Sequence, residues 1–431
     1  MQKESYRLSG EARGGYNPPA MTELPLAGIR VCDLTWVIAG PTATRILADF
    51  GAEVIRVEHG QAADPIRFGR PIAGEKPTLN NSGFFNYFNR NKKSVLLNVR
   101  HPLGMEVLHR LIRVSDVVIE NFSSGVLESW GLDYAAQRAI NPGVIYCSIS
   151  GFGHTGRDRH FTTWGPTAQA LSGLTLMSGL PGKPPAGWGY SYLDHTAGYY
   201  AAIAVMMALH HRNVTGEGQA IDIAQVETGM VLTGPAVLDY EVNGRSWLRE
   251  EMPPGNRAWE PRTAPHNTYR CAGEDRWVAI AVRNDAEWEA MRRAMGEPGW
   301  AAEAKFATNA GRLEHEDELD AGIEAWTRER DAYDVMAVLQ AAGVPAGVCQ
   351  TAGDRVERDP QLRARGWWTT MPHAELGESG FDGVAPRLHR TPGTNRTPSP
   401  LMGEHTYEVM TGTLGMTPEE YAELEGLGVF M

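Results

Sequence analysis

Short β-branched runs alternate with segments of helical periodicity in the N-terminal half of this 431-residue chain. Residues 28–34 (GIRVCDL) and 53–57 (EVIRV) are typical of buried strands. Between them, residues 42–50 place apolar side chains at helical spacing, after Pro41, which suits a first helical turn, and before Gly51, which suits a helix end. A strand–helix–strand unit of this kind requires two parallel strands joined by a right-handed crossover.

The same alternation continues to about residue 224. Further strands are predicted over residues 94–97, 116–119, 143–149 and 220–223, and helices over residues 102–114, 132–140, 167–177 and 196–212. This pattern predicts an α/β fold, an open sheet with helices on both faces. Beyond residue 225 the pattern changes, with a linker predicted over 241–267, a hairpin over 269–282, and helices over 288–295, 314–340 and 418–427.

Composition and charge exclude several classes of protein. The net charge of −12 at pH 7 argues against nucleic-acid binding, which usually needs a basic excess. No run of 18 apolar residues predicts a membrane-spanning helix, and the polar first twenty residues do not resemble a signal peptide and are expected to fray. The four cysteines form no CxxC pair and the histidines lack metal-ligand spacing, so we expect reduced thiols in a cytoplasmic protein without a metal site.

The two common nucleotide-binding motifs are absent from the sequence, and one basic run is the remaining candidate for phosphate binding. The turn after the first predicted strand, WVIAGP at residues 36–41, lacks the GxGxxG pattern that cradles a dinucleotide, so an NAD enzyme is not predicted. No GxxxxGK[ST] phosphate loop occurs either. The basic run RNKK at residues 90–93, with Arg100 shortly after it, is either a solvated turn or an edge that binds a pyrophosphate or a 3′-phosphate.

Asp194 is the most suggestive acid in the chain. It follows an aromatic stretch, WGYSYL at residues 188–193, and precedes a long apolar helical segment. An aspartate at this place can cap the helix through its N-terminal N–H groups. It can also act as a carboxylate nucleophile that forms an acyl-enzyme anhydride or ester. The residues alone favour the cap.

Several stretches together resemble one enzyme family, the class III CoA-transferases, which includes formyl-CoA and carnitine CoA-transferases and α-methylacyl-CoA racemase. They run from about residue 25 to the C-terminus and include LAGIRVCDLTWVIAGPTATRILADFGAEVIRVE, NRNKKSVLLNVRHPLG, SDVVIENFSSGVLESWGL, NPGVIYCSISGFGHTG, RNVTGEGQAIDIAQVE and PLMGEHTYEV. The resemblance implies that Asp194 is the nucleophile and that CoA transfer proceeds through a mixed anhydride and an aspartyl-CoA thioester. It also implies an acyl-CoA and a carboxylic acid as substrates, with no permanently bound cofactor. The CoA-contacting positions that it implies are Val37, Ile38, His59, Leu97, Arg100, Asn121 and Phe122.

The resemblance also implies an interlocked homodimer, with a Rossmann-like large domain and an inserted smaller α+β domain. With the composition break near residue 225, this predicts a flexible extension over residues 1–24, the first part of the large domain over 25–225, and a linker and small domain over 226–345. Residues 346–431 then return to complete the large domain.

Two positions depart from the family pattern. Racemases carry a His–Asp pair where this chain has Trp164 and Gly165, which argues against racemisation. Formyl-CoA transferase has a glutamate at the position of Gly165, and its glycine-rich lid is not evident here, so a non-catalytic partner subunit of a hetero-oligomeric transferase is the alternative. Residues 184–190 resemble subunits of succinyl-CoA:benzylsuccinate-type transferases. We therefore expect succinyl-CoA as donor and a bulky or aromatic dicarboxylic acceptor.

Overall fold

The chain divides into two compact units in the computed structural model, which describes residues 23–248 and 252–431. The larger unit comprises residues 23–174, 188–234 and 360–431, and the smaller unit comprises residues 175–187 and 235–359. The extension predicted over residues 1–24 lies outside the described residues apart from its last two.

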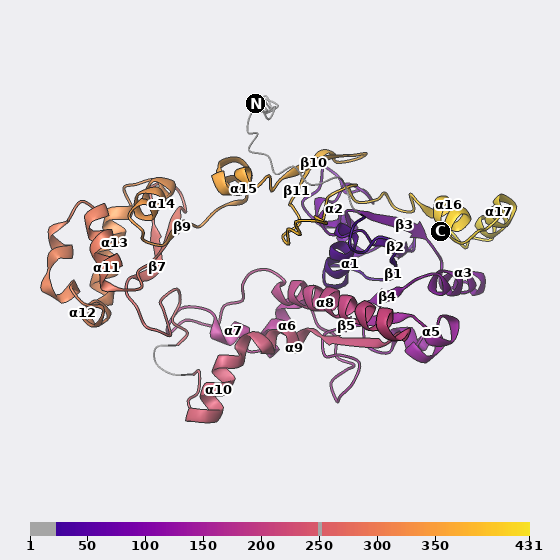
Figure 1. Cartoon of the computed structure of the whole chain (residues 1–431), viewed down its shortest axis with the longest axis horizontal. Coiled ribbons are helices and arrows are strands. Elements are labelled where there is room, and N and C mark those ends of the chain that lie inside the picture. Colours follow the sequence, from indigo (N-terminus) through magenta and orange to yellow (C-terminus); the bar gives the residue numbers. More distant parts are fainter. Residues whose placement is uncertain (1–22, 249–251) are drawn as a thin grey trace. The chain divides into compact units, whose positions relative to one another are not determined.

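A parallel six-stranded sheet forms the centre of the larger unit (Figure 1). Its strands are β1 (Arg30–Asp33), β2 (Glu53–Glu58), β3 (Lys92–Leu96), β4 (Val117–Glu120), β5 (Ile145–Ser150) and β6 (Ala220–Ala224). Their order is β3-β2-β1-β4-β5-β6, and every neighbouring pair is parallel. This is the strand order of the Rossmann fold, and it reverses between β1 and β4, where such sheets open a crevice at their carboxyl ends.

Helices cover both faces of this sheet, as the alternation predicted. The helices of the unit are α1 (Ala39–Asp49), α2 (Gly83–Asn89), α3 (Pro102–Arg113), α4 (Val126–Ser129), α5 (Tyr134–Ile140), α6 (Gly165–Leu171), α8 (Tyr192–Thr215), α9 (Gln225–Met230), α15 (Pro360–Ala364), α16 (Thr406–Glu408) and α17 (Pro418–Gly426). Successive residues of β1 point to opposite faces. Val31 packs in the cluster with α1 and α8, whereas Cys32 packs in the cluster with α3.

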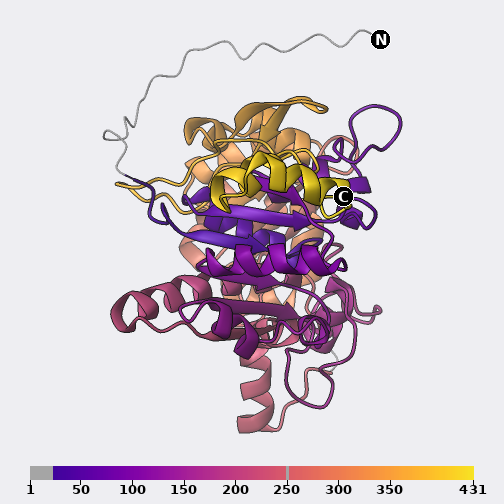
Figure 2. The same cartoon turned by 90° about the vertical axis from the view of Figure 1, so that its right-hand side faces the viewer.

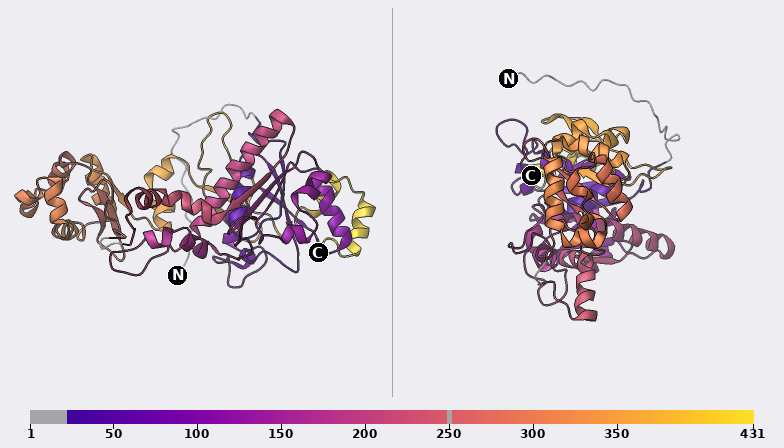
Figure 3. Two further views of the ribbon diagram at one scale, coloured as in Figure 1. Left: turned by 90° about the horizontal axis from the view of Figure 1, so that it is seen from below. Right: turned by 90° about the vertical axis from the view of Figure 1, so that its left-hand side faces the viewer.

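Helix α8 lies along the sheet beside α1 (Figure 3, left). The two helices approach closely at Gly198, where an added Cβ would lie 2.7 Å from the Ala39 carbonyl oxygen. This close approach holds the start of α8 against the turn that follows β1, and so positions Asp194, which lies one turn before Gly198.

The C-terminal segment runs along the outer edge of the sheet (yellow in Figure 2). The Leu96 N–H donates to Oγ1 of Thr406 at 3.0 Å, and the Asn98 N–H donates to the Val429 carbonyl at 2.8 Å. A short antiparallel pair, β10 (Thr369–His373) and β11 (Gly377–Phe381), also belongs to the larger unit. The sequence pattern did not predict this pair.

The smaller unit contains an antiparallel sheet and several helices. Its elements are β7 (His266–Arg270), β8 (Trp277–Ala281), β9 (Ala346–Val348), α11 (Asp285–Ala294), α12 (Asn309–Glu314), α13 (Glu316–Thr327) and α14 (Ala332–Ala341). The predicted hairpin is confirmed as β7 and β8. The single helix predicted over 314–340 is wrong, because α13 ends at Thr327 and Asp331 caps a new helix by accepting from the Tyr333 N–H.

Two more helices, α7 (Leu174–Met177) and α10 (Gly234–Asn243), begin at the boundaries between the units. Within the ranges that the structure describes, no helix combines the length and hydropathy needed to cross a bilayer. The four cysteines are free thiols, of which Cys349 alone is exposed.

Candidate active site

The turn after β1 has an unusual backbone that neighbouring elements hold in place. Val37 has a φ of 63°, in the left-handed region that a β-branched residue rarely adopts. Its N–H donates to Oδ2 of Asp64 at 3.0 Å. Asn121, directly after β4, accepts from the Trp36 N–H at 2.7 Å and donates its amide to the Trp36 carbonyl at 2.9 Å. Both ends of the Asn121 amide are therefore occupied in fixing this turn.

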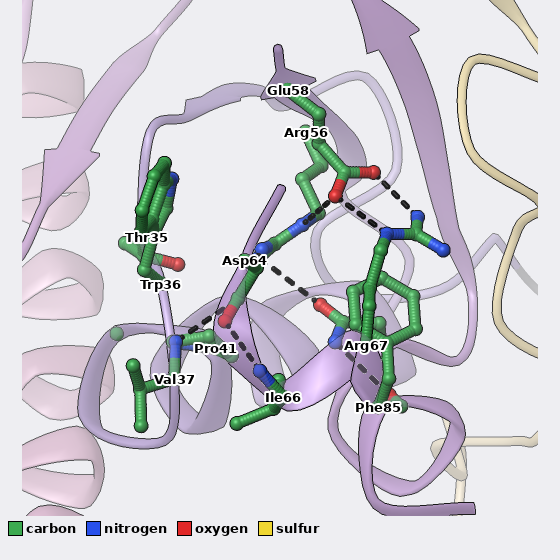
Figure 4. A network of polar contacts seen from close by, with 12 residues as sticks. Thr35, Trp36, Val37, Pro41, Arg56, Glu58, Asp64, Ile66, Arg67 and Phe85 are labelled. Atoms are coloured by element: carbon green, nitrogen blue, oxygen red, sulfur yellow. Dashed lines mark hydrogen bonds and ion pairs between the residues drawn. The ribbon is translucent and has the colours of Figure 1, made fainter. Parts of the chain in front are cut away.

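A buried network of charges supports the same turn (Figure 4). Arg56 Nη2 lies 2.5 Å from Oδ2 of Asp64, and Arg67 Nη2 lies 2.6 Å from Oε2 of Glu58. All four side chains are almost completely buried. Burial alone would raise the pKa of Glu58, but the charges of Arg56 and Arg67, with hydrogen bonds from Arg67 and Ser94, lower it to about 2. The network therefore carries full charges in the core and anchors the left-handed turn through Asp64.

A cavity of about 270 Å³ opens beside this turn, at the carboxyl ends of β4 and β5. Its lining includes Trp36, Val37, Ile38, Asn121, Phe122, Ser124, Ser150, Arg159, Trp164, Gly165, Asp194 and Gln225. Sites for drug-sized ligands usually enclose roughly 300–1,000 Å³. This cavity is therefore of a size for a small acyl group and not for a whole nucleotide.

Asp194 lies in the first turn of α8, partly buried, with its carboxylate at the cavity. Ser191 occupies the N-cap position, so Asp194 is not the cap that its sequence context favoured. Gln225 Nε2 donates to Oδ1 of Asp194 at 2.6 Å. Burial raises the pKa of Asp194 above its ordinary value, and hydrogen bonds from Gln225 and Ser191 partly oppose this rise. A poorly hydrated carboxylate held by neutral hydrogen-bond donors has the properties of a nucleophile.

Gly165 faces the other oxygen of this carboxylate. A Cβ added to Gly165 would lie 2.7 Å from Oδ2 of Asp194 and 2.7 Å from Cβ of Ser191. Any side chain at this position would force Asp194 or Ser191 to move. The glycine therefore gives the carboxylate its space, which is a physical reason for the departure noted in the sequence.

Gln225 is a site residue for which the sequence pattern gave no role. It is buried and begins α9, immediately after β6. Its Oε1 accepts from Oγ1 of Thr163 at 3.4 Å, which turns the amide so that Nε2 faces Asp194. A polar residue directly after a strand of a parallel sheet was the available signal, because such sheets place their sites at the carboxyl ends.

Five of the eight predicted site residues line one cavity: Val37, Ile38, Asn121, Phe122 and Asp194. The other three, His59, Leu97 and Arg100, do not line it. His59 and Leu97 follow the neighbouring strands β2 and β3, and the Leu97 N–H donates to the Glu58 carbonyl at 2.8 Å. Arg100, three residues further on, is exposed.

The basic run at residues 90–93 is not a solvated turn, since Arg90 and Lys92 are buried. Arg90 forms ion pairs with Asp49 and Asp382, Lys92 with Asp33, and Lys93 with Glu53 and Glu408. These cations are neutralised internally, so nothing in the structure supports a phosphate-binding edge there. Within the described ranges, no cluster of three or more His, Cys, Asp or Glu side chains is arranged to hold a metal ion.

Comparison with known proteins gives one consistent result. The sequence profile of CoA-transferase family III matches residues 26–406. The chain is 36% identical to succinyl-CoA–D-citramalate CoA-transferase of Chloroflexus aurantiacus, covering 93% of this chain and 97% of that protein. It is 34% identical to the succinyl-CoA–L-malate CoA-transferase beta subunit of the same organism, covering 94% and 97%. The crystal structure of a CAIB/BAIF family protein from Brucella suis superposes with a TM-score of 0.81 at 31% identity, covering 91% and 100%.

Proposed function

The chain belongs to CoA-transferase family III, and from this premise we propose that Asp194 is the nucleophile that moves CoA from an acyl-CoA to a free carboxylic acid. The observation that carries the proposal is the Asp194 carboxylate itself. It lies at a small cavity, accepts a hydrogen bond from Gln225, and has no cationic partner among the described residues. Its charge is therefore not already neutralised by the protein.

The proposed reaction exchanges one activated acyl bond for another. An Asp194 oxygen attacks the thioester carbon of the donor, the C–S bond breaks, and CoA leaves as a thiolate while a mixed anhydride forms. The thiolate attacks the Asp194 carbonyl, which releases the donor acid and leaves an aspartyl-CoA thioester. The acceptor carboxylate attacks that thioester and expels the thiolate, which then attacks the acceptor acyl carbon. The product acyl-CoA forms and the Asp194 carboxylate is regenerated.

The walls of the cavity suit this chemistry. Trp36, Ile38 and Phe122 are apolar and limit access of water, which would hydrolyse an aspartyl anhydride. We propose that the reactive end of CoA enters past Val37, Ile38, Asn121 and Phe122, with Asn121 acting by fixing the turn. His59, Leu97 and Arg100 then contact the nucleotide end.

We propose succinyl-CoA as donor and a dicarboxylic acid as acceptor, since the Chloroflexus relatives are named for succinyl-CoA with citramalate or malate. We also propose the interlocked dimer and a cytoplasmic location.

The match to a protein named as a beta subunit favours one second candidate function, a subunit of a hetero-oligomeric transferase. The Asp194–Gln225 pair counts against a non-catalytic role in such an assembly. Racemisation is disfavoured by Trp164 and Gly165.

The test is to trap the covalent intermediate. The purified protein is incubated with a panel of acyl-CoAs, treated with hydroxylamine or borohydride, and its peptides are mapped by mass spectrometry. A hydroxamate or alcohol at Asp194 supports the mechanism, and the acyl-CoA that produces it identifies the class of CoA donor. No modification from any donor, in protein that binds CoA, contradicts it and favours the partner-subunit role.

Replacing Gln225 with leucine should shift the pH dependence of this step. The change removes a hydrogen bond to the ionised carboxylate, so the pKa of Asp194 should rise further. The acid limb of the rate of intermediate formation should then move to higher pH. The matched control is Gln137→Leu in α5, which removes a buried hydrogen bond to the Leu132 carbonyl and should leave the pH profile unchanged. An unshifted profile in Gln225→Leu would show that Gln225 does not act on Asp194.

A further inference from the structure

The cavity beside Asp194 has a second polar part built around Arg159. Among the described residues that line it, Arg159 is the one cation and Asp194 is the one acid. The Arg159 guanidinium donates to the His154 carbonyl at 3.2 Å and to the His160 ring at 3.1 Å. No carboxylate among the described residues forms a salt bridge with it, whereas Arg157 in the same loop pairs with Asp158. Part of a planar donor fork is therefore held at the cavity without an anion.

Two buried hydroxyls line the same cavity. Ser124 and Ser150 are only 9% and 8% exposed, and the Oγ atom of each has no hydrogen-bond partner among the described residues. Ser150 is the last residue of β5, and Ser124 follows β4, so rigid strands position both. A buried hydroxyl without a partner is costly, so a polar ligand is expected opposite these groups.

We infer that Arg159, Ser124 and Ser150 form a receptor for the far carboxylate of a dicarboxylic acyl group, so that the cavity selects acyl chains with a negatively charged end. The inference rests on the function proposed above, with the near carboxyl carbon at Asp194. A guanidinium binds a carboxylate through paired N–H groups, and hydroxyls supply further donors. The same cation offsets the repulsion between the Asp194 carboxylate and an anionic substrate. An acyl chain that ends in a methyl group would offer no acceptor to any of these three groups.

Arg159 could instead bind the pyrophosphate of CoA, which is also an anion. Two acyl-CoA donors with acyl chains of equal length distinguish these two ligands. Succinyl-CoA and butyryl-CoA share the CoA moiety and the four-carbon chain and differ in the terminal carboxylate. The rate of Asp194 labelling is measured for both donors in the wild type and in Arg159→Gln. The ratio of the succinyl rate to the butyryl rate should fall about 10²-fold in the variant. Ser150→Ala should lower the same ratio by about tenfold.

Arg157→Gln is the matched control, because Arg157 is a neighbouring exposed arginine that does not line the cavity, and its ratio should equal that of the wild type. An unchanged ratio of the succinyl rate to the butyryl rate in Arg159→Gln overturns the inference. If both rates fall together, Arg159 contacts a phosphate of CoA, and if neither falls, Arg159 binds neither group. If Arg159→Gln does not fold, a wild type that reacts equally well with both donors overturns it. Failure of every donor to label wild-type Asp194 is a different result, which removes the proposed function itself.

Discussion

Replacing Asp194 with asparagine should lower the rate of CoA transfer by about 10⁴-fold or more, the scale of loss seen when an enzyme loses its nucleophile. The amide is not nucleophilic, so no aspartyl anhydride forms. The change keeps the shape of the side chain, and Oδ1 can still accept from Gln225 Nε2. Acyl-CoA binding and thermal stability should therefore persist. The measurements are the steady-state transfer rate and trapping with hydroxylamine.

The control for this variant is Asp133→Asn. Asp133 is an exposed helix cap that accepts from the Ala136 N–H, and asparagine caps a helix as well as aspartate does. Its transfer rate should equal that of the wild type. Retention of a tenth of the wild-type rate in Asp194→Asn would rule out covalent catalysis by this residue.

Replacing Arg56 with methionine should lower the free energy of unfolding by about 3–5 kcal/mol, the usual cost of removing one partner from a buried ion pair. Arg56 lies 2.5 Å from Asp64 and 3.4 Å from Glu58, and none of the three is exposed. The variant leaves two buried carboxylates short of positive charge. The measurement is urea-induced unfolding followed by circular dichroism.

Two further variants make this result specific. Arg113→Met removes an exposed arginine and should change the free energy of unfolding by less than about 0.5 kcal/mol. The double variant Arg56→Met with Asp64→Asn should lose less than the two single changes summed, because both remove the same interaction. An additive double variant, or a loss below about 1 kcal/mol in Arg56→Met, would show that the network does not stabilise the larger unit.

The pH dependence of stability has a defined sign at Glu58. Its pKa is lowered in the folded chain to about 2 from an ordinary 4.5. Its contribution to stability is therefore present above about pH 4.5 and is lost as the pH falls toward 2. Because Arg56→Met raises the folded pKa of Glu58, this variant should lose less stability on acidification than the wild type.

The strands and helices of the large sheet could be predicted because their apolar residues repeat at fixed periods. All six strands lie within three residues of their predicted positions. The pair β10 and β11 escaped prediction because it falls in a proline- and glycine-rich region whose pairing depends on tertiary packing. The burial of Arg90 and Lys92 was not predicted because their partners, Asp49 and Asp382 for Arg90 and Asp33 for Lys92, are distant in sequence and only the fold brings them together.

The candidate site also combines features that could be predicted from the sequence with features that depend on the tertiary structure. Asp194 was predicted as the nucleophile only through the resemblance, since its own context favoured a helix cap. Gln225 carries no local pattern that marks it as a partner of an acid 31 residues away. The space that Gly165 leaves for the carboxylate is a property of packing in three dimensions, and so is the lack of a partner for the Ser124 and Ser150 hydroxyls in the described part of the chain. No periodicity in the sequence encodes them.

The discontinuity of the larger unit has a consequence for its biosynthesis. Residues 360–431, which cover the edge strand β3, leave the ribosome after the whole of Pro235–Asp359. At roughly 5–20 residues per second, this interval is on the order of 10 s. During that time the nascent sheet has an uncovered edge, which can pair with another chain. Slow release of the C-terminal segment, or truncation of the chain before residue 360, should therefore increase aggregation.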